Sequence, residues 1–276
     1  MQKTVFITGC SSGIGKATAL MFARAGWNVA ATMRNPTHFP AADLDEHVTL
    51  MALDVRSNDA IKAALSDCID HFGRIDCVVN NAGQGLLSVF EATPIDLVRD
   101  LFETNTFGIM QITQAILPHF RAWGSGSLVN VTSAAAISPD PLMAVYDASK
   151  WAVEGFTEAL HYELEPHGIA VKLIEPGFVP TTNMVRQIQE RSQAVPVPSV
   201  YRAIVDRAVA HYMAVAKALK LATEEDVASC ILTAATDGNR RQLRYVVGED
   251  AELAAHKRRS TSESEYMAWV RSRLPA

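Results

Sequence analysis

Short runs rich in β-branched residues alternate along this chain with longer segments in which apolar residues recur at helical spacing. The short runs predict seven strands, near residues 3–8, 28–33, 48–53, 75–80, 127–132, 170–175 and 244–247. The longer segments predict helices near residues 14–25, 58–72, 94–121, 146–165 and 224–237. Strands that alternate with helices in this way are typical of stacked βαβ units. We therefore expect an α/β fold built on one doubly wound, seven-stranded parallel sheet.

Helix start signals support three of these segments. Ser57 precedes the second helix, Thr93-Pro94 precedes the third, and Thr223 stands ahead of three acidic residues at the last one. Side chains of this kind satisfy or tolerate the unpaired N–H groups of a first helical turn. We expect the helices to begin at these positions.

Two stretches depart from the alternation. Residues 37–47 carry little periodic pattern and predict a surface connection. Residues 181–222 combine a proline-containing lead with an apolar helical run, which predicts a helical lid over a substrate site. We expect a single domain over residues 1–250 that includes this lid, followed by a C-terminal extension over residues 251–276 that forms a solvated helix.

Composition and charge exclude several classes of protein. The 276 residues are 49% hydrophobic and 20% charged, and a formal net charge of −5 gives no basic footprint for nucleic acid. The four cysteines lack the spacing of a metal site or a disulfide framework. Apolar runs fall far short of the roughly 20 residues that span a bilayer, and the first strand leaves no room for a signal segment. We expect a soluble cytoplasmic protein with no metal and no membrane contact.

The first motif that carries chemistry lies between the opening strand and the first helix. Its residues that we expect to meet a dinucleotide are Gly9, Ser11, Ser12, Gly13, Ile14 and Gly15. Glycines here let the backbone turn tightly and approach a pyrophosphate, which the helix N-terminus attracts through its unpaired N–H groups. A glycine cluster alone is often only a turn. Its place at the start of a βαβ array predicts a Rossmann-type dinucleotide-binding domain.

The end of the second strand bears on which nicotinamide cofactor is bound. In a dinucleotide fold this residue meets the ribose 2′ position, where an acid would favour a 2′-hydroxyl. This chain has Met33 followed by Arg34, and a guanidinium can pair with a 2′-phosphate. The sequence therefore favours NADP(H), although Arg34 could instead be a solvated charge at a strand end.

Tyr146 and Lys150 open a helix four residues apart, so their side chains share one helix face. Such a pair is weak evidence alone, because exposed pairs at this spacing are common. Ser133 strengthens it, since it follows the fifth strand at a carboxyl end, where open α/β sheets place their ligand crevice. The three residues therefore predict a ligand site at this end of the sheet.

Taken together, these motifs resemble those of the short-chain dehydrogenase/reductase family over residues 3–250. The resemblance rests on order and spacing of the motifs Thr8 to Gly15, Asp54-Val55, Asn80-Asn81-Ala82-Gly83, Asn105, Ser133, Tyr146-xxx-Lys150 and Pro176-Gly177-xxx-Thr181. The chain is also similar to the branch with 17β-hydroxysteroid and retinol dehydrogenase-like enzymes.

The resemblance implies roles for the matching residues. Tyr146 would be the general acid/base, Ser133 would hold the substrate oxygen, and Lys150 would bind the nicotinamide ribose and lower the phenol pKa. Asn105 would support a water-linked proton relay, or serve only as a kink residue. Cofactor contacts would fall on the glycine motif, Arg34, Asp54, Val55, Asn81, Ala82, Gly83, Tyr146, Lys150, Pro176, Gly177, Val179 and Thr181. Asn81 could instead stabilise its turn, and Thr181 could cap a helix.

Candidate substrate contacts are mostly apolar. They are Ser133, Ala135, Leu142, Tyr146, Phe178 and Met184, with Ala134, Met143 and Val145 as further wall residues and Asp140 as either a filter against anions or a turn residue. Such a wall suits a hydrophobic ketone or aldehyde and its alcohol. We expect an NADP(H)-dependent oxidoreductase that is a homodimer or homotetramer, pairing through faces that include Trp151, Phe156 and Leu160.

Two other classes of function share parts of this pattern. A non-catalytic NADP(H) sensor would need the glycine motif and Arg34 but not Ser133, Tyr146 and Lys150 together. A lyase or epimerase on the same fold would need a larger substrate domain than this chain can supply. The sequence therefore favours an enzyme that transfers a hydride to or from a small molecule.

Overall fold

A computed structural model describes residues 2–40, 43 and 45–273 of the chain. Its sheet has the order β3-β2-β1-β4-β5-β6-β7, and every neighbouring pair is parallel. The strands are β1 (Thr4–Thr8), β2 (Asn28–Met33), β3 (Val48–Ala52), β4 (Cys77–Asn80), β5 (Gly126–Val131), β6 (Ile169–Pro176) and β7 (Arg244–Val247). The predicted doubly wound, single-domain α/β fold is confirmed, and each strand lies within two residues of its predicted limits.

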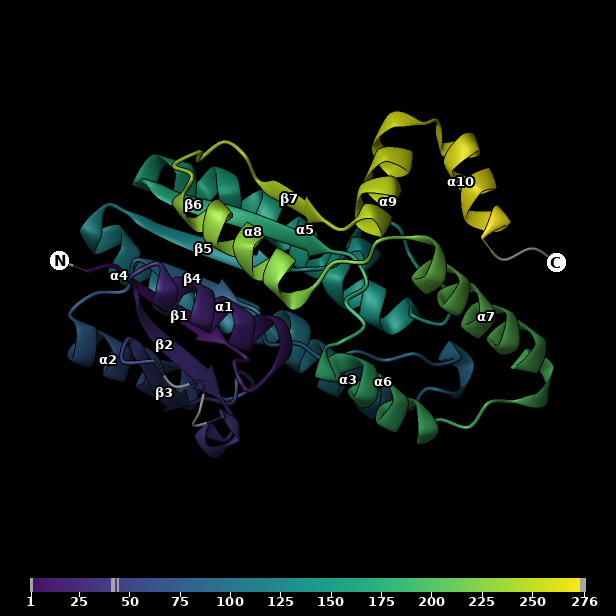
Figure 1. Ribbon diagram of the computed structural model, residues 1–276, viewed down its shortest axis with the longest axis horizontal. Coiled ribbons are helices and arrows are strands. Elements are labelled where there is room, and N and C mark those ends of the chain that lie inside the picture. The colour runs from purple at the N-terminus through teal and green to yellow at the C-terminus, as the bar shows by residue number, and fades with distance from the viewer. Residues whose placement is uncertain (1, 41–42, 44, 274–276) are drawn as a thin grey trace.

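The α-helices lie on both faces and at one end of this sheet. They are α1 (Gly13–Arg24), α2 (Asn58–Phe72), α3 (Ile95–Phe102), α4 (Gly108–Trp123), α5 (Ala144–Leu164), α6 (Asn183–Gln193), α7 (Arg202–Ala218), α8 (Glu224–Thr236), α9 (Glu249–Ser260) and α10 (Glu263–Ser272). Figure 1 shows α6, α7, α9 and α10 gathered at the same end of the molecule.

Alternation of side chains along the buried strands builds two cores. Val5 and Ile7 of β1 face a core closed by α1 and α8, whereas Phe6 faces a core closed by α2, α4 and α5. All three β1 side chains are fully buried, as expected for a central parallel strand covered on both faces. The sheet is therefore a rigid, dry platform whose strand ends can hold side chains in fixed positions.

Helix limits follow the start signals at two of the three predicted positions. The Ser57 hydroxyl accepts from the Ala60 N–H, and Thr223 forms a capping box with Asp226. At the third, Pro94 is the N-cap and the helix begins at Ile95. The predicted helix 94–121 is also interrupted, because residues 103–107 form a π-helical turn between α3 and α4.

The C-terminal extension differs from the expected solvated helix. It forms two helices, and Ala251, Ala254, Ala255 and Tyr266 are buried. The prediction was wrong because the tail returns to β7 and to the loop after β5, where these small side chains pack closely. The interface prediction also needs correction: Leu160 is buried and Phe156 packs in the core of α2, α4 and α5.

Some expectations reach beyond the described residues. The predicted connection 37–47 includes residues 41, 42 and 44, and the extension ends with residues 274–276, which lie outside the described ranges. In the part of that connection that is described, Pro36–His38 form one 3₁₀ turn. Within residues 2–40, 43 and 45–273, no helix is long and apolar enough to cross a bilayer.

Candidate active site

The glycine loop joins β1 to α1 with a backbone that only glycine adopts readily. Gly9 and Gly13 have φ angles of 74° and 57°, in the left-handed region. A Cβ at Gly15 would lie 2.2 Å from the Gly9 carbonyl oxygen, so the third glycine lets the helix pack against its own loop. Ser12 is the N-cap of α1, and its side chain makes no capping hydrogen bond. The first N–H groups of α1 are thus available to an anion.

Asn81, after β4, ties this loop to the neighbouring strand. Its Nδ2 donates to the Thr8 carbonyl oxygen at 2.9 Å, and the Thr8 hydroxyl accepts from the N–H groups of Asn81 and Ala82 at 3.0 Å each. Asn80 lies deeper and donates to Asn130. The structure thus supports the alternative in which Asn81 stabilises its turn, while its contact with a ribose stays a prediction.

The structure brings Ser133, Tyr146 and Lys150 together at the carboxyl end of β5. Tyr146 and Lys150 occupy the first turns of α5 and are only 6% and 3% exposed. Lys150 Nζ lies 5.9 Å from the Tyr146 ring centroid and donates to the Val131 carbonyl oxygen at 3.0 Å. Ser133 follows in extended backbone, with its hydroxyl accepting from the Ala135 N–H. The predicted cluster is therefore a buried one.

Burial moves the two ionisable groups in opposite directions. It raises the pKa of Tyr146 to about 12, an effect that the Ser133 hydroxyl opposes. It lowers the pKa of Lys150 to about 8, and the charge of Glu154 opposes that shift. At neutral pH the protein therefore holds a protonated phenol beside a protonated ammonium group, so the phenol has a proton to give.

Asn105 lies at the centre of the π-helical turn and is fully buried. Its Nδ2 donates to the Gln84 carbonyl oxygen and to the Ser149 hydroxyl, and its Oδ1 accepts from the Gln84 N–H at 2.8 Å. The helix distortion turns this side chain toward α5, because an extra residue in the turn shifts the face that points inward. Asn105 thus joins the loop after β4 to α5.

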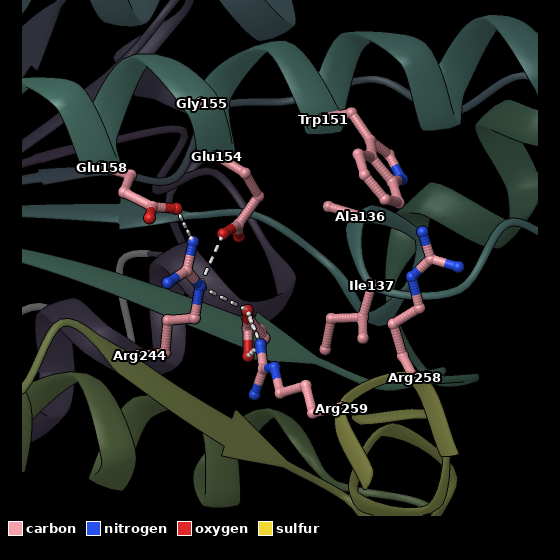
Figure 2. Close-up of a pocket in the computed structure, with 10 residues that line it drawn as sticks. Ala136, Ile137, Trp151, Glu154, Gly155, Glu158, Arg244, Arg258 and Arg259 are labelled. Atoms are coloured by element: carbon pink, nitrogen blue, oxygen red, sulfur yellow. Dashed lines mark hydrogen bonds and ion pairs between the residues drawn. The ribbon is translucent and has the colours of Figure 1, made fainter. Parts of the chain in front are cut away.

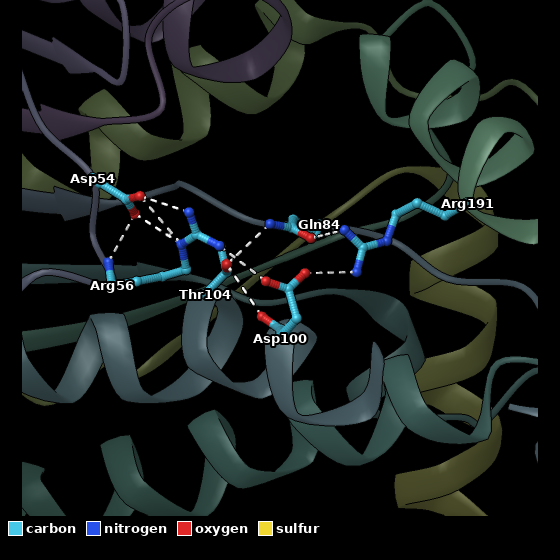
Figure 3. Close-up of polar contacts among 6 residues, drawn as sticks. All are labelled: Asp54, Arg56, Gln84, Asp100, Thr104 and Arg191. Carbon is cyan, nitrogen blue, oxygen red and sulfur yellow. Dashed lines mark hydrogen bonds and ion pairs between the residues drawn. The ribbon is translucent and has the colours of Figure 1, made fainter. Parts of the chain in front are cut away.

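At the other end of the predicted cofactor site, Asp54 is engaged by a neighbour. Figure 3 shows the Arg56 guanidinium against its carboxylate, with Nη2 2.7 Å and Nε 3.0 Å from the carboxylate oxygens. This guanidinium holds the pKa of Asp54 below its usual value, and the charge of Arg34 adds to the effect. Val55 is a core residue, so of the predicted adenine contacts only Asp54 is partly exposed. Arg34 is exposed beside it.

The segment after β6 is held by a residue that the sequence did not single out. Asp250 of α9 accepts from the Phe178 N–H at 2.7 Å, and a Cβ at Gly177 would clash with its carboxylate. Val179 is buried in the core, and Thr181 is exposed and donates to Glu224. Thr182, not Thr181, is the N-cap of α6, and it lies 3.5 Å from an added Cβ at Gly13. The segment therefore closes over the glycine loop.

Comparison with known proteins shows the family of this chain. The family model described as short chain dehydrogenase matches residues 3–193. The chain belongs to the short-chain dehydrogenase family. An uncharacterized oxidoreductase of Schizosaccharomyces pombe is 33% identical over 243 residues, covering 88% of this chain and 99% of the relative. Retinol dehydrogenase 8 of Bos taurus is 36% identical over 201 residues, covering 70% of this chain and 64% of that protein, which agrees with the expected retinol dehydrogenase-like branch.

Solved structures give the same result. A short-chain dehydrogenase from Streptomyces avermitilis superposes with a TM-score of 0.81 at 28% identity, covering 98% of this chain and 96% of that one. ElxO with NADP bound has a TM-score of 0.71 at 27% identity, covering 90% of this chain and 96% of that one. NAD⁺-bound xylitol dehydrogenase has a TM-score of 0.78 at 26% identity, covering 89% of this chain and 97% of that one. The protein is thus an oxidoreductase of a family that binds nicotinamide cofactors, with relatives that hold either form.

Several of the predicted substrate contacts of this short-chain dehydrogenase lie in or near the loop before α5. Leu142 has a φ of 64°, unusual for a residue with a side chain, and its carbonyl oxygen accepts from the Ser88 N–H. Ala135 is buried, and its carbonyl oxygen accepts from the Trp151 indole. Val145 packs with Leu86 and Leu101 in a separate small core, so it is not a wall residue. The loop is held from several sides.

Two acidic residues near Tyr146, Asp140 in this loop and Asp147 in the first turn of α5, make contacts that the sequence did not predict. The sequence left Asp140 as either a turn residue or a filter against anions. In the structure it forms an ion pair with Arg273 of the C-terminal tail. Asp147 is buried next to Tyr146 and accepts from the Asp140 N–H at 3.0 Å, and burial raises its pKa to about 8. Its inward spacing from Met143, one helical turn earlier, was the available signal.

The lid of the dehydrogenase lies against the site. Helix α6 packs directly on the loop after β4. A Cβ added at Gly85 of that loop would lie 2.5 Å from Ile188 and 3.3 Å from Met184 of α6. Arg191 reaches Gln84 and lies 2.9 Å from Asp100 on α3 (Figure 3). Phe178, at the base of the lid, is 42% exposed. The predicted lid helix α6 is therefore held against the loop after β4 and against α3.

Proposed function

We propose that this short-chain dehydrogenase interconverts a hydrophobic ketone or aldehyde and its alcohol with NADP(H), using Tyr146 as the general acid/base. The observation that carries the proposal is the buried cluster of Ser133, Tyr146 and Lys150 beside the glycine loop. A phenol and an ammonium group are rarely buried together without a chemical role, since burial costs both of them interaction with water.

The residues present fit a dinucleotide. The uncapped N-terminus of α1 and the left-handed Gly9 and Gly13 offer N–H groups and a close backbone approach to a pyrophosphate. Arg34 is exposed at the end of β2, where a 2′-phosphate would find a cation, and this supports NADP(H) over NAD(H). When bound, the nicotinamide supplies the hydride that adds to the carbonyl carbon.

The chain's own residues supply the proton and hold the oxygen. Ser133 donates a hydrogen bond to the carbonyl oxygen, and Tyr146 gives its phenolic proton to the same oxygen as negative charge develops there. Lys150 then lies 5.9 Å from the ring that has lost a proton, so its positive charge stabilises the phenolate. Hydride and proton together convert the carbonyl to an alcohol, and the reverse steps oxidise an alcohol.

The substrate class follows from the walls. Leu142, Phe178 and Met184 are apolar, and Asp140 is engaged with Arg273, so no free charge of this set meets the substrate. Such walls suit a lipophilic carbonyl compound. The protein would work as a homodimer or homotetramer, since Phe107, Trp123 and Tyr162 are exposed on the α4–α5 side. All four cysteines are free thiols, which supports a reducing, cytoplasmic setting.

The test is NADPH consumption at 340 nm with a panel of steroid, retinoid, aromatic and aliphatic carbonyls. Tyr146→Phe should lower kcat by at least a hundredfold, since general acid catalysis typically contributes about 10²–10⁴-fold, while leaving NADPH affinity within about twofold. Exposed Tyr162→Phe, on the same helix, is the control and should turn over normally. Unchanged turnover in Tyr146→Phe would reject the mechanism, and NADPH binding with no turnover of any carbonyl would favour a non-catalytic sensor.

A further inference from the structure

Lys150 is a buried cation with little around it to balance its charge. Its Nζ donates to the Val131 carbonyl oxygen, and within the described part of the chain no carboxylate lies within 4 Å of it. A buried ammonium group without a compensating charge tends to lose its proton. The proposed function requires Lys150 to be protonated, so something further away must support that state.

Glu154 lies one helical turn beyond Lys150 on the same face of α5 and is 6% exposed. Its Oε1 accepts from the Thr132 hydroxyl at 2.7 Å. Thr132 stands between Val131, whose carbonyl oxygen holds Lys150, and Ser133, which would hold the substrate oxygen. The Glu154 carboxylate therefore contacts the short strand end that positions both groups.

The outer side of Glu154 faces a cluster of charges, drawn in Figure 2. Arg244 of β7 places its Nε 3.1 Å from Glu154 and 3.4 Å from Glu175, and its Nη2 2.6 Å from Glu158. Arg259 of α9 lies 2.8 Å from Glu175, which is fully buried on β6. Glu154 and Glu175 both lie against Arg244, so the two carboxyl groups are close together. The positive charges of Arg244 and Arg259 offset the repulsion between them.

A hollow of about 280 Å³ opens beside this cluster, between α5, β7 and α9. Arg258 and Trp151 line its far side, with the guanidinium 5.9 Å from the indole centroid and 3.2 Å from Glu263. The hollow is lined by the outward side of α5 and not by Tyr146 or Ser133. The charges facing Glu154 are thus Lys150 and Glu158 on its own helix, Arg244 on β7, Glu175 on β6, and Arg258 and Arg259 on α9.

We propose that Glu154 is a positioning residue for the reaction: its carboxylate favours the protonated form of Lys150 and holds Thr132, while Arg244 and Arg259 oppose the effect of burial, which favours the neutral form of Glu154. The proposal rests on the proposed function for its catalytic meaning, but the coupling of Glu154 to Lys150 exists in the free protein. An opposite charge one turn away favours the ammonium form, and the dry surroundings strengthen that effect.

The direct test is an NMR titration of the lysine ¹³Cε resonances in the protein without cofactor. The Lys150 resonance is assigned by its loss in Lys150→Arg. In Glu154→Gln it should lose its proton about one pH unit earlier than in the wild type, because the nearest balancing charge is gone. Glu154→Asp, which keeps the charge, should restore most of the difference.

Glu158→Gln is the matched control. Glu158 also pairs with Arg244, yet it is half exposed and has no contact with Thr132. Its removal should leave the Lys150 titration unchanged. An unchanged titration in Glu154→Gln, or an equal shift in both variants, would overturn the proposal. If Glu154→Gln does not fold, the wild-type Lys150 resonance must show a second inflection at acid pH as Glu154 takes up a proton, and its absence rejects the coupling.

Turnover gives the second readout. In Glu154→Gln the loss of kcat at high pH should begin about one pH unit earlier than in the wild type, with KM for the carbonyl little changed. A fall in kcat that is the same at every pH would indicate a purely structural role and reject the proposal. A wild-type protein that reduces no carbonyl would reject the proposed function, and the NMR titration would still decide on Glu154.

Discussion

At the residue scale, the same buried position gives Tyr146 and Lys150 opposite tendencies. Burial favours the neutral form of each side chain. It therefore makes the Tyr146 phenol harder to deprotonate and the Lys150 ammonium group easier to deprotonate. The pair is therefore set for proton donation as long as Lys150 stays charged. The surrounding residues matter to the chemistry mainly through that charge.

Arg34 allows a prediction at this scale. Arg34→Ala should weaken NADPH binding by about 10–100-fold and NADH binding by less than about twofold, because only a 2′-phosphate gains a charge-assisted hydrogen bond from the guanidinium. Fluorescence titration with both cofactors measures the two affinities. Arg24 is exposed at the end of α1 that lies away from the glycine loop, and Arg24→Ala should change neither affinity. Equal weakening of both cofactors would remove the basis for NADP(H).

At the scale of elements, Arg191 gives α6 of the predicted lid its polar attachment to the rest of the molecule, beside the packing of Ile188 and Met184 on Gly85. Arg191 joins it to Gln84 and to Asp100, and Asp100 also accepts from Arg56, which binds Asp54. A continuous row of polar contacts therefore runs from the predicted adenine end to the lid (Figure 3). This row therefore links the position of α6 to the loop after β3.

Arg191→Met should raise KM for the carbonyl several-fold and speed hydrogen exchange in residues 183–193, because a lid with a weaker fastening is open more of the time. The measurements are steady-state kinetics and hydrogen-exchange mass spectrometry. Arg186→Met is the matched control, since Arg186 pairs only with Glu190 of the same helix and both are exposed. If both variants behave alike, Arg191 does not fasten the lid.

At the scale of the whole molecule, the C-terminal tail contacts the loop between Ser133 and Tyr146. Arg273, at the end of α10, pairs with Asp140 and donates to Ser138 at 3.2 Å, and Tyr266 donates to the same hydroxyl at 2.9 Å. Those contacts hold the loop that leads from Ser133 to Tyr146. Residues of α10 and its C-terminal end thereby hold a loop from the middle of the chain.

This contact predicts a pH-dependent loss of stability. Burial raises the pKa of Asp140 and Arg273 opposes that shift, so Arg273→Met leaves a buried carboxylate that is costly to ionise. Its Tm should fall by roughly 2–5 °C at pH 7. The cost is present while Asp140 is ionised and disappears as it takes up a proton, so the difference from the wild type should narrow toward pH 4.

Thermal unfolding across this pH range measures the effect. Arg271→Met, an exposed arginine two positions earlier on α10, should leave Tm within about 1 °C at every pH. A Tm difference for Arg273→Met that does not depend on pH would mean that the contact with Asp140 is not its source.

The positions of the strands, the glycine loop and the Ser133, Tyr146 and Lys150 cluster were predictable because each depends on local pattern. Alternating apolar runs define buried strands, and the ends of parallel strands meet at one edge. Residues at those ends are therefore neighbours whatever the rest of the chain does. The spacing of Tyr146 and Lys150 fixes a common helix face in the same way.

The sequence by itself thus determined the doubly wound sheet, the glycine loop between β1 and α1, and the proximity of Ser133, Tyr146 and Lys150. Only the tertiary structure decided which charges surround that cluster: Glu154 with Arg244, Asp140 with Arg273, and Asp250 on the segment after β6. The reason is that these partners are separated by 72 to 133 residues along the chain. A charge at such a distance leaves no periodic signal, and its partner is chosen by the packing of whole helices against the sheet.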